Sequence, residues 1–314
     1  QVVVISGNHD SPERLSAVAP LAKHHGITLI GTPVMQPVHL TTTLGETLQV
    51  AALPYPSEAR LKELFTQSQE ESVLQQAYEE RVRYLIAQLS ESFSPQSVNI
   101  VMSHLFVAGG LETDSERPIQ VGGAYTVSPA VFPASAQYVA LGHLHRPQAM
   151  SHPDTTIRYS GSPLAYSFSE AGQAKSVTII AGKAGEQLET QELYLRSGKP
   201  LVSWRATSIE EVLAWLDEGR DAHCWIDVEI EVDDVMSMDE IQRIRKAHDG
   251  IVHIRPIYRM ARDEQGDEIS MAHLPLDQLF IKFYERQTGG ATPDEEMIKL
   301  FYELVDDDEQ TERG

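Results

Sequence analysis

Short apolar runs recur along the first two thirds of the chain, separated by polar and helical segments. Residues 2–6, 98–104 and 137–145 are apolar runs that end at polar residues, which predicts a strand in each place. The first two are expected to be buried, because they carry few polar side chains on either face. Further short strands are predicted at 27–31, 38–43, 48–55 and 176–180.

Helical segments lie between these strands. Residues 12–25 are predicted to form a helix, with Ser11 as its N-cap and Pro12 at its first position. Residues 57–93 are predicted to be helical as well, in two pieces with charged outer faces. Strands alternating with helices in this way indicate an α/β fold.

The pattern changes near Pro200 to that of a small α+β domain. Two capping boxes, at 208–211 and 237–240, are predicted to begin helices, and the first helix should end at Gly219. Residues 224–232 alternate between apolar and polar side chains, which predicts a strand with one covered face. The expected division of the chain is 1–199, 200–259 and 260–314, the last part being a polar linker, two helices and an acidic tail.

The two helices near the C-terminus carry apolar stripes. The second is predicted to begin with Thr292 as N-cap, Pro293 at the first position and Glu295 closing a capping box. The striped residues are Leu279, Phe280, Phe283, Ile298, Phe301 and Tyr302. Two short striped helices on a polar linker favour a partner-binding module, and the alternative is that they pack on the chain's own domain.

Composition narrows the class of protein. The single cysteine, Cys224, rules out an internal disulfide and fits a reducing cytoplasm. No apolar run is long enough for a bilayer, and the first residues have a strand pattern rather than that of a signal peptide. The formal net charge of −21 argues against non-specific nucleic-acid binding through an overall basic surface. It leaves open a local basic groove or a metal-centred phosphate site.

Candidate metal ligands stand where three predicted strands end. Asn8, His9 and Asp10 follow the first strand, His104 ends the second, and His143 and His145 end the third. Strand ends of this kind can meet at one edge of a sheet. Amide oxygen and neutral imidazole suit manganese, iron or zinc, and two such ions can clamp a phosphodiester and activate water. Each motif alone has an ordinary structural interpretation, but the three in this order predict a metal-phosphate site.

The motifs GNHD, a strand ending in histidine, and GHLH resemble the second half of the metallophosphoesterase signature of calcineurin-like phosphatases and DNA-repair nucleases. The stretches YVALGHLHRPQ and RYSGSPLAYSFSEAGQAKSV are similar to the SbcD nuclease subunits in particular. This resemblance implies a four-layer α/β/β/α metallophosphoesterase sandwich lacking its first strands. It also implies a small α+β capping domain and a C-terminal helix pair that binds a partner.

The resemblance also implies roles for the histidines. Asn8, His104 and His143 would bind one divalent metal ion, and His145 would bind the second, with Mn²⁺ as the expected ion. His9 would be the catalytic residue, contacting the scissile phosphate and stabilising charge or protonating the leaving oxygen. Asp10 would either orient His9 or cap the following helix.

Other residues have less specific roles. Arg146, Ser160 and Ser162 are candidate phosphate or DNA contacts, although a surface salt bridge is the alternative for Arg146 and a tight turn for Gly161. The resemblance places the helix at 12–25 in a dimer interface, but ordinary core packing would produce the same apolar stripe.

The implied function is that of the nuclease subunit of an SbcC–SbcD-type complex. It would hydrolyse DNA phosphodiesters as a double-strand exonuclease and as a single-strand and hairpin endonuclease. Its expected partners are DNA and a coiled-coil ATPase, SbcC, in a heterotetramer built on a homodimer, without a membrane. It would act in DNA repair, recombination and replication, in the cytoplasm at the nucleoid.

Two alternatives stay open: a metallophosphoesterase with a non-DNA substrate, and a non-catalytic scaffold with a degenerate site. The family's Asp-x-His and Gly-Asp motifs, which supply a bridging aspartate, do not precede Gly7. We therefore expect a chain cut inside its first domain, which is inactive alone although the full-length protein is an enzyme.

Overall fold

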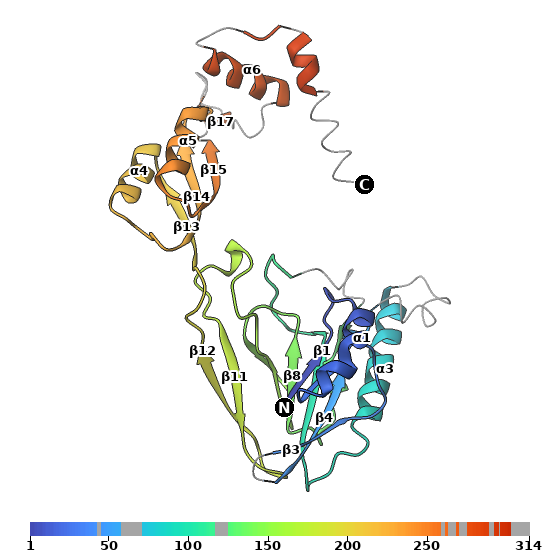
Figure 1. Cartoon of the computed structure of the whole chain (residues 1–314). Coiled ribbons are helices and arrows are strands. Elements are labelled where there is room, and N and C mark those ends of the chain that lie inside the picture. The colour runs from blue at the N-terminus through green and yellow to red at the C-terminus, as the bar shows by residue number, and fades with distance from the viewer. Residues whose placement is uncertain are drawn as a thin grey trace. The chain divides into compact units, whose positions relative to one another are not determined.

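The computed structural model describes residues 1–42, 45–57, 71–116, 125–258, 261–262, 268–269, 275–288, 292–294 and 296–302. The chain divides into two compact units, Gln1–Gly198 and Lys199–Gly314, and each is described by itself (Figure 1). Both units combine helices with sheets, which confirms the predicted α/β class.

A six-stranded sheet is the centre of the first unit, in the order β3-β4-β5-β8-β10-β9. The strands are β3 (Val38–Thr41), β4 (Thr47–Leu53), β5 (Val98–His104), β8 (Tyr138–Gly142), β9 (Gln148–Met150) and β10 (Thr156–Tyr159). The four inner strands are parallel, and both edge strands are antiparallel to their neighbours. His104 is in register with Gly142, so β5 and β8 end side by side at one edge.

Helix α3 (Glu71–Leu89) packs on one face of this sheet. Ile86 and Leu89 are fully buried with Leu53 and Val101 in the largest apolar core. The helix predicted at 57–93 ends at Leu89 rather than at Phe93. Residues 90–92 form a turn instead, and the Ser90 hydroxyl in this turn donates to the Ile86 carbonyl. Residues 58–70 of that prediction lie outside the described part of the chain.

Two small sheets pack on the opposite face. In the first, β1 (Val2–Ile5) runs parallel to β2 (Ile27–Ile30); in the second, β11 (Ser176–Ala181) is antiparallel to β12 (Glu189–Tyr194). Helix α1 (Pro12–Lys23) lies against β2. The described elements of this unit thus follow the order α3, six-stranded sheet, two small sheets, α1. Its remaining short elements are β6 (Phe106–Val107), β7 (Thr126–Val127) and two 3-10 turns, Pro129–Val131 and Phe168–Glu170.

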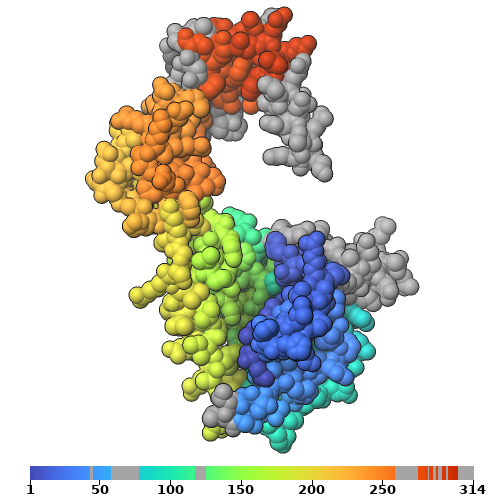
Figure 2. All heavy atoms as spheres, viewed as in Figure 1, coloured from blue at the N-terminus to red at the C-terminus, as the bar shows by residue number. Residues whose placement is uncertain are grey.

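The first strand and helix differ from expectation in their burial. Val2 is 51% exposed and the rest of β1 is half-buried, so the prediction of a buried strand is wrong in that respect. The reason is that β1 has a strand partner, β2, along one edge only within the described residues. Ser11 and Pro12 begin α1 as predicted, but the Ser11 side chain makes no capping bond. No residue of α1 is buried, and Figure 2 shows this blue segment on the outside of its unit.

The second unit contains a parallel sheet of β13 (Leu201–Ala206), β14 (Trp225–Val232) and β15 (Ile251–Tyr258). Helices α4 (Ile209–Asp217) and α5 (Met238–Ala247) pack with the sheet in one apolar core. The predicted alternation is confirmed, since the buried side chains of β14 include Ile226, Val228, Ile230 and Val232. Asp227 is buried on the other face, where it forms an ion pair with Arg255.

Helix starts in this unit follow the predictions in part. At α5 the capping box of Ser237 and Glu240 is complete. At α4 the Ser208 hydroxyl accepts from the Glu211 N–H, but the Glu211 carboxylate accepts from the backbone and hydroxyl of Thr207 instead of closing the box. Thr207 offers that carboxylate two donors where the Ser208 backbone would offer one, so the predicted box at 208–211 is only half formed.

The C-terminal part consists of a short hairpin, β16 (Ala261–Arg262) with β17 (Glu268–Ile269), then α6 (Leu276–Gln287) and helical residues 296–302. The prediction of Thr292 as N-cap is wrong. Asp294 is the N-cap, because its side chain accepts from the Met297 N–H at 2.8 Å and its carbonyl accepts from the Ile298 N–H. Glu295 lies outside the described residues. Over the part of the chain that is described, no helix combines the length and apolarity that a membrane span requires.

Candidate metal centre

The candidate site forms where β1 meets the edge of the six-stranded sheet. Ser6, directly after β1, donates its N–H to the Ile30 carbonyl and its hydroxyl to the Gly31 carbonyl at 2.8 Å. Its own carbonyl accepts from the N–H of Tyr55, just beyond β4. These bonds join the ends of two sheets, so the turn that follows Ser6 lies over the end of β5.

Asn8 and His104 are brought into direct contact although they are 96 positions apart. The Asn8 Oδ1 atom lies 2.9 Å from His104 Nε2. With metal–ligand bonds of about 2.1 Å, neighbouring ligand atoms on one ion lie about 3 Å apart, so this spacing suits a shared ion. Two glycines make room for the ring: a Cβ on Gly7 would lie 2.8 Å from His104 Cε1, and one on Gly142 would lie 3.0 Å from its Nδ1.

Asp10 takes neither of its two predicted roles. Its Oδ2 atom accepts from the Gly7 N–H at 2.7 Å and so closes the GNHD turn. That bond, rather than a contact with His9 or with the start of α1, is the one its carboxylate makes in the described structure. His9 is exposed, and it lies close enough to contribute to the low pKa values of His104 and His143.

His143 follows β8 and faces His104, with ring centroids 5.4 Å apart. Its backbone has a φ of 109°, which L-residues rarely adopt and which costs of order 1–3 kcal/mol. Its Nε2 atom is buried without a hydrogen-bond partner in the described structure, and so is the Asn8 amide nitrogen. A buried ring nitrogen held in a strained conformation with nothing to bond fits a metal ligand.

The protonation of both buried histidines also suits a metal. Burial, reinforced by His143, lowers the pKa of His104 to about 3. Burial lowers the pKa of His143 to about 4, although the Glu116 carboxylate opposes that change. Both imidazoles are therefore neutral at neutral pH, the form in which they can donate an electron pair to a metal ion.

His145 lies close enough to contribute to the low pKa of His104, but it has partners of its own. Its Nδ1 atom lies 2.7 Å from the Ser115 hydroxyl and 3.0 Å from Glu170 Oε1. Its backbone N–H donates to Glu116 Oε1 at 2.8 Å. Among the described residues, no three His, Cys, Asp or Glu side chains form a metal site by themselves. The candidate centre thus consists of Asn8 with the imidazoles of His104 and His143, and His145 lies near it.

Sequence reasoning did not find four residues that bond to His145, which are Ser115, Glu116, Glu170 and Lys175. Burial opposes the charge of Glu170, but hydrogen bonds from Lys175 and Ser115 outweigh it and lower the pKa of Glu170. The stretch SFSEAGQAKSV contains Glu170 and Lys175, but nothing local in it shows that both side chains turn inward. Their burial depends on the loop that carries Ser115, 55 residues away from Glu170.

The candidate phosphate contacts, Arg146, Ser160 and Ser162, differ from one another in exposure and in hydrogen bonding. Ser162 is buried, donates to the Leu164 carbonyl at 2.7 Å and accepts from Lys175, whereas Arg146 is exposed. The Ser160 hydroxyl lies 3.4 Å from Thr178 Oγ1. Gly161 has a φ of +79° and a Cβ there would lie 2.7 Å from the ring of Pro147, so both its backbone conformation and this close approach favour glycine. Whether Arg146 and the two serines contact phosphate stays a prediction.

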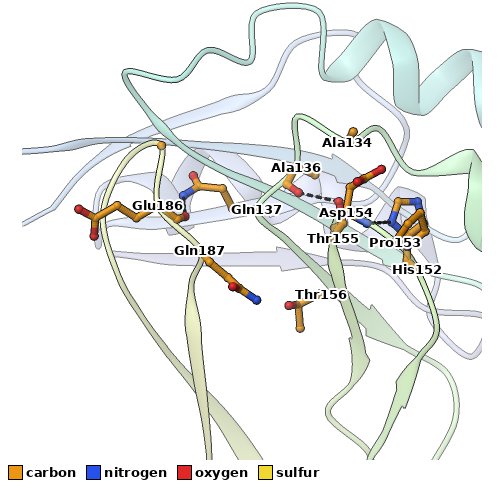
Figure 3. Close-up of a pocket in the computed structure, with 11 residues that line it drawn as sticks. Ala134, Ala136, Gln137, His152, Pro153, Asp154, Thr155, Thr156, Glu186 and Gln187 are labelled. Atoms are coloured by element: carbon orange, nitrogen blue, oxygen red, sulfur yellow. Dashed lines mark hydrogen bonds between the residues drawn. The ribbon is translucent and has the colours of Figure 1, made fainter.

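A cavity of about 410 Å³ lies elsewhere in the first unit, as Figure 3 shows. It is lined by residues before β8 and at the start of β10, among them Gln137, His152, Asp154 and Thr156. These are the amino-terminal ends of the strands, opposite the edge that carries His104 and His143. Because it lies at the opposite ends of the strands, this cavity does not belong to the metal centre, and the polar groups of Gln137 and Thr155 in it bond to the protein backbone.

Comparison with known proteins identifies the family of this chain. Residues 197–288 match the family model SbcD_C, described as the Type 5 capsule protein repressor C-terminal domain. The chain is 54% identical over 306 residues to a protein of Bacillus subtilis (strain 168) named as the SbcD component of the nuclease SbcCD, an alignment that covers 97% of this chain and 78% of the relative. The chain belongs to the SbcD family. The resemblance to SbcD is thereby confirmed, and the SbcD_C match runs from before β13 to the end of α6.

Proposed function

We propose that this SbcD-family chain is the nuclease subunit of an SbcC–SbcD-type complex and hydrolyses DNA phosphodiesters with divalent metal ions. The observation that carries the proposal is the contact between Asn8 Oδ1 and His104 Nε2 beside the unpaired Nε2 of His143. It occurs in a chain that is 54% identical to a protein named as a nuclease subunit.

In this proposal Asn8, His104 and His143 hold one ion, His145 is a ligand of a second, and Mn²⁺ is the preferred metal. Bound metal supplies Lewis-acid stabilisation of the phosphate and an activated water. The chain's own part is to present two neutral imidazoles and an amide oxygen. Exposed His9 donates a hydrogen bond to the developing oxyanion or a proton to the leaving oxygen. Exposed Arg146 and half-buried Ser160 contact the DNA phosphates.

The finer features of the proposal follow from the same family. The order α3, six-stranded sheet, small sheets, α1 supports a four-layer α/β/β/α metallophosphoesterase sandwich. The activities are double-strand exonuclease and single-strand and hairpin endonuclease, in DNA repair, recombination and replication, in the cytoplasm at the nucleoid. The exposed helix α1 belongs to a homodimer interface, and the dimer joins two ATPase subunits in a heterotetramer.

The proposed contact with the coiled-coil ATPase is made by the C-terminal helices. Leu279, Phe280, Phe283 and Phe301 line an apolar pocket of about 430 Å³ together with Val235, Pro256 and Tyr258. An apolar pocket beside a half-buried helix is the kind of groove in which a helix of a partner can dock. Ile298 is half-buried and Tyr302 is 40% exposed, on the second helix.

The test of the catalytic assignment is His9→Ala in the full-length subunit assembled with its ATPase partner. Mn²⁺-dependent cleavage of linear duplex and hairpin DNA should fall by about 10²–10⁴-fold, the usual contribution of a general acid. Mn²⁺ content should be unchanged, because His9 is proposed to act on the phosphate. His24→Ala, at an exposed histidine just after α1, is the matched control and should cleave normally. Loss of Mn²⁺ from the His9 variant would show that His9 is a ligand; undiminished cleavage would remove it from the mechanism.

A further inference from the structure

One buried ion pair in the first unit, between Glu170 and Lys175, has no role in the metal assignment. Ser115 and the proposed ligand His145 are bonded to the same glutamate. The side chain of Glu170 is 0% exposed and that of Lys175 is 8% exposed. Burying an ion pair is costly unless its remaining hydrogen-bonding atoms are satisfied, so the partners of each atom are informative.

Every polar atom of this pair has a partner. The Lys175 ammonium donates to Glu170 Oε2, to the His145 carbonyl at 3.1 Å and to the Ser162 hydroxyl at 3.0 Å, which uses its three donors. Glu170 Oε1 accepts from the Ser115 hydroxyl and lies 3.0 Å from His145 Nδ1. The ion pair therefore bonds to both the backbone carbonyl and the ring of His145.

The bonding pattern decides which ring nitrogen of His145 carries the proton. A carboxylate paired with an ammonium group can only accept hydrogen bonds. The hydrogen of Ser115 is directed to Glu170, so the Ser115 oxygen is also an acceptor toward the ring. Both neighbours of His145 Nδ1 are thus acceptors, and this nitrogen must be the donor. In the neutral ring, Nε2 then has a free electron pair.

We propose that Glu170, backed by Lys175, is the positioning residue that fixes His145 in the Nδ1–H tautomer and directs its Nε2 electron pair at the metal centre. This inference rests on the proposed function, in which His145 is a ligand of the second ion. Outer-shell carboxylates of this kind hold the ring orientation of ligating histidines and typically change metal affinity by about 10–100-fold.

The decisive experiment is Glu170→Gln, examined in the metal-free chain at about pH 8 by long-range ¹H–¹⁵N correlation of the histidine rings. The His145 signals are identified by their absence in His145→Asn. The unmodified chain should show the Nδ1–H tautomer. The glutamine amide can donate toward Nδ1, so the variant should shift toward the Nε2–H tautomer. Calorimetric titration with Mn²⁺ alone should show about 10–100-fold weaker binding in the variant.

Two further variants serve as a charge-neutral version of the test and as its matched control. Glu170→Gln leaves the charge of Lys175 buried without a counter-ion, so Glu170→Gln with Lys175→Met removes both charges and should fold with the same altered tautomer. Glu192→Gln is the matched control, because Glu192 of β12 forms its ion pair with Arg158 of β10 and not with the groups around His145. It should change neither the tautomer nor Mn²⁺ affinity.

The tautomer and the titration separate this inference from the proposed function. If the tautomer changes as expected but no form of the chain binds Mn²⁺, the positioning role stands and the proposed metal chemistry fails. An Nε2–H or doubly protonated His145 in the unmodified chain overturns the inference. An unchanged tautomer in both Glu170 variants overturns it as well.

Discussion

At the scale of single residues, the candidate centre depends on how closely the backbone approaches the His104 ring, as much as on which residue types serve as ligands. The His104 ring lies between Gly7 and Gly142, and a Cβ at either position would come within 3.0 Å of it. The glycine of the GNHD turn is therefore explained by the ring it faces rather than by the turn. Its neighbour Asn8 can reach His104 Nε2 only because Gly7 has no side chain.

Gly7→Ala should displace His104 and weaken Mn²⁺ binding at least ten-fold, about 1.4 kcal/mol, as measured by calorimetric titration. The cause is the 2.8 Å contact that the new methyl would make with His104 Cε1. Gly26→Ala is the control. Gly26 has a φ of +72° with open space around it, so alanine should cost about 1–2 kcal/mol of stability and leave Mn²⁺ binding intact. Equal Mn²⁺ affinity in the two variants would contradict this role of Gly7.

At the scale of elements, the C-terminal helices combine self-packing with an open apolar surface. Phe280 of α6 stacks on Phe301 at 4.3 Å between ring centroids, which joins the two helices. Both rings also line the pocket with Pro256 and Tyr258 of β15. The stripe predicted to bind a partner is thus partly used within the second unit, while its outer side chains, such as Tyr302, stay exposed.

Phe301→Glu should weaken association with the ATPase subunit at least ten-fold, about 1.4 kcal/mol, in a pull-down titration. The carboxylate would stand in the apolar pocket, where a docking helix of the partner would have to desolvate it. Leu300→Glu is the matched control, because Leu300 is 53% exposed and does not line the pocket. Global unfolding of the Phe301 variant, or unchanged association, would show that the stripe serves the chain's own core.

At the scale of the whole molecule, the chain has separate apolar cores. The largest core of the first unit is built around Leu53, Val101 and Ile86, and that of the second unit around Val228 and Ile230. Among the described residues, none belongs to both. Each unit therefore has its own source of stability, and damage to one core should be felt first within its own unit.

Ile230→Ala should cost the second unit about 2–5 kcal/mol, because Ile230 is fully buried in its core. Hydrogen exchange should show lost protection in β13, β14 and β15, with protection of β4, β5 and β8 retained. Leu53→Ala in the first unit is the reciprocal variant and should give the opposite pattern. Equal loss of protection in both units from either variant would contradict independent cores.

Local patterns in the sequence determined much of this architecture. The apolar runs placed β5 and β8, the alternation placed the covered face of β14, and the residues Asn8, His104 and His143 were recognised by their place at strand ends. These features are local because side-chain period and ligand chemistry are properties of a few neighbouring residues. The metal motifs indicated the metallophosphoesterase superfamily, and the stretch from Arg158 to Val177 narrowed the resemblance to the SbcD family, which the comparison confirmed.

Only the tertiary structure decided which of several near-equivalent partners each polar group takes. Asp10 closes its own turn, Glu211 bonds Thr207, and Asp294 rather than Thr292 caps its helix. The contact between Glu170 Oε1 and His145 Nδ1 joins side chains that are 25 positions apart in the sequence. Such choices differ by about 1 kcal/mol per hydrogen bond, less than the effect of burying or exposing the groups concerned. Burial is set by how distant segments pack, which no local pattern records.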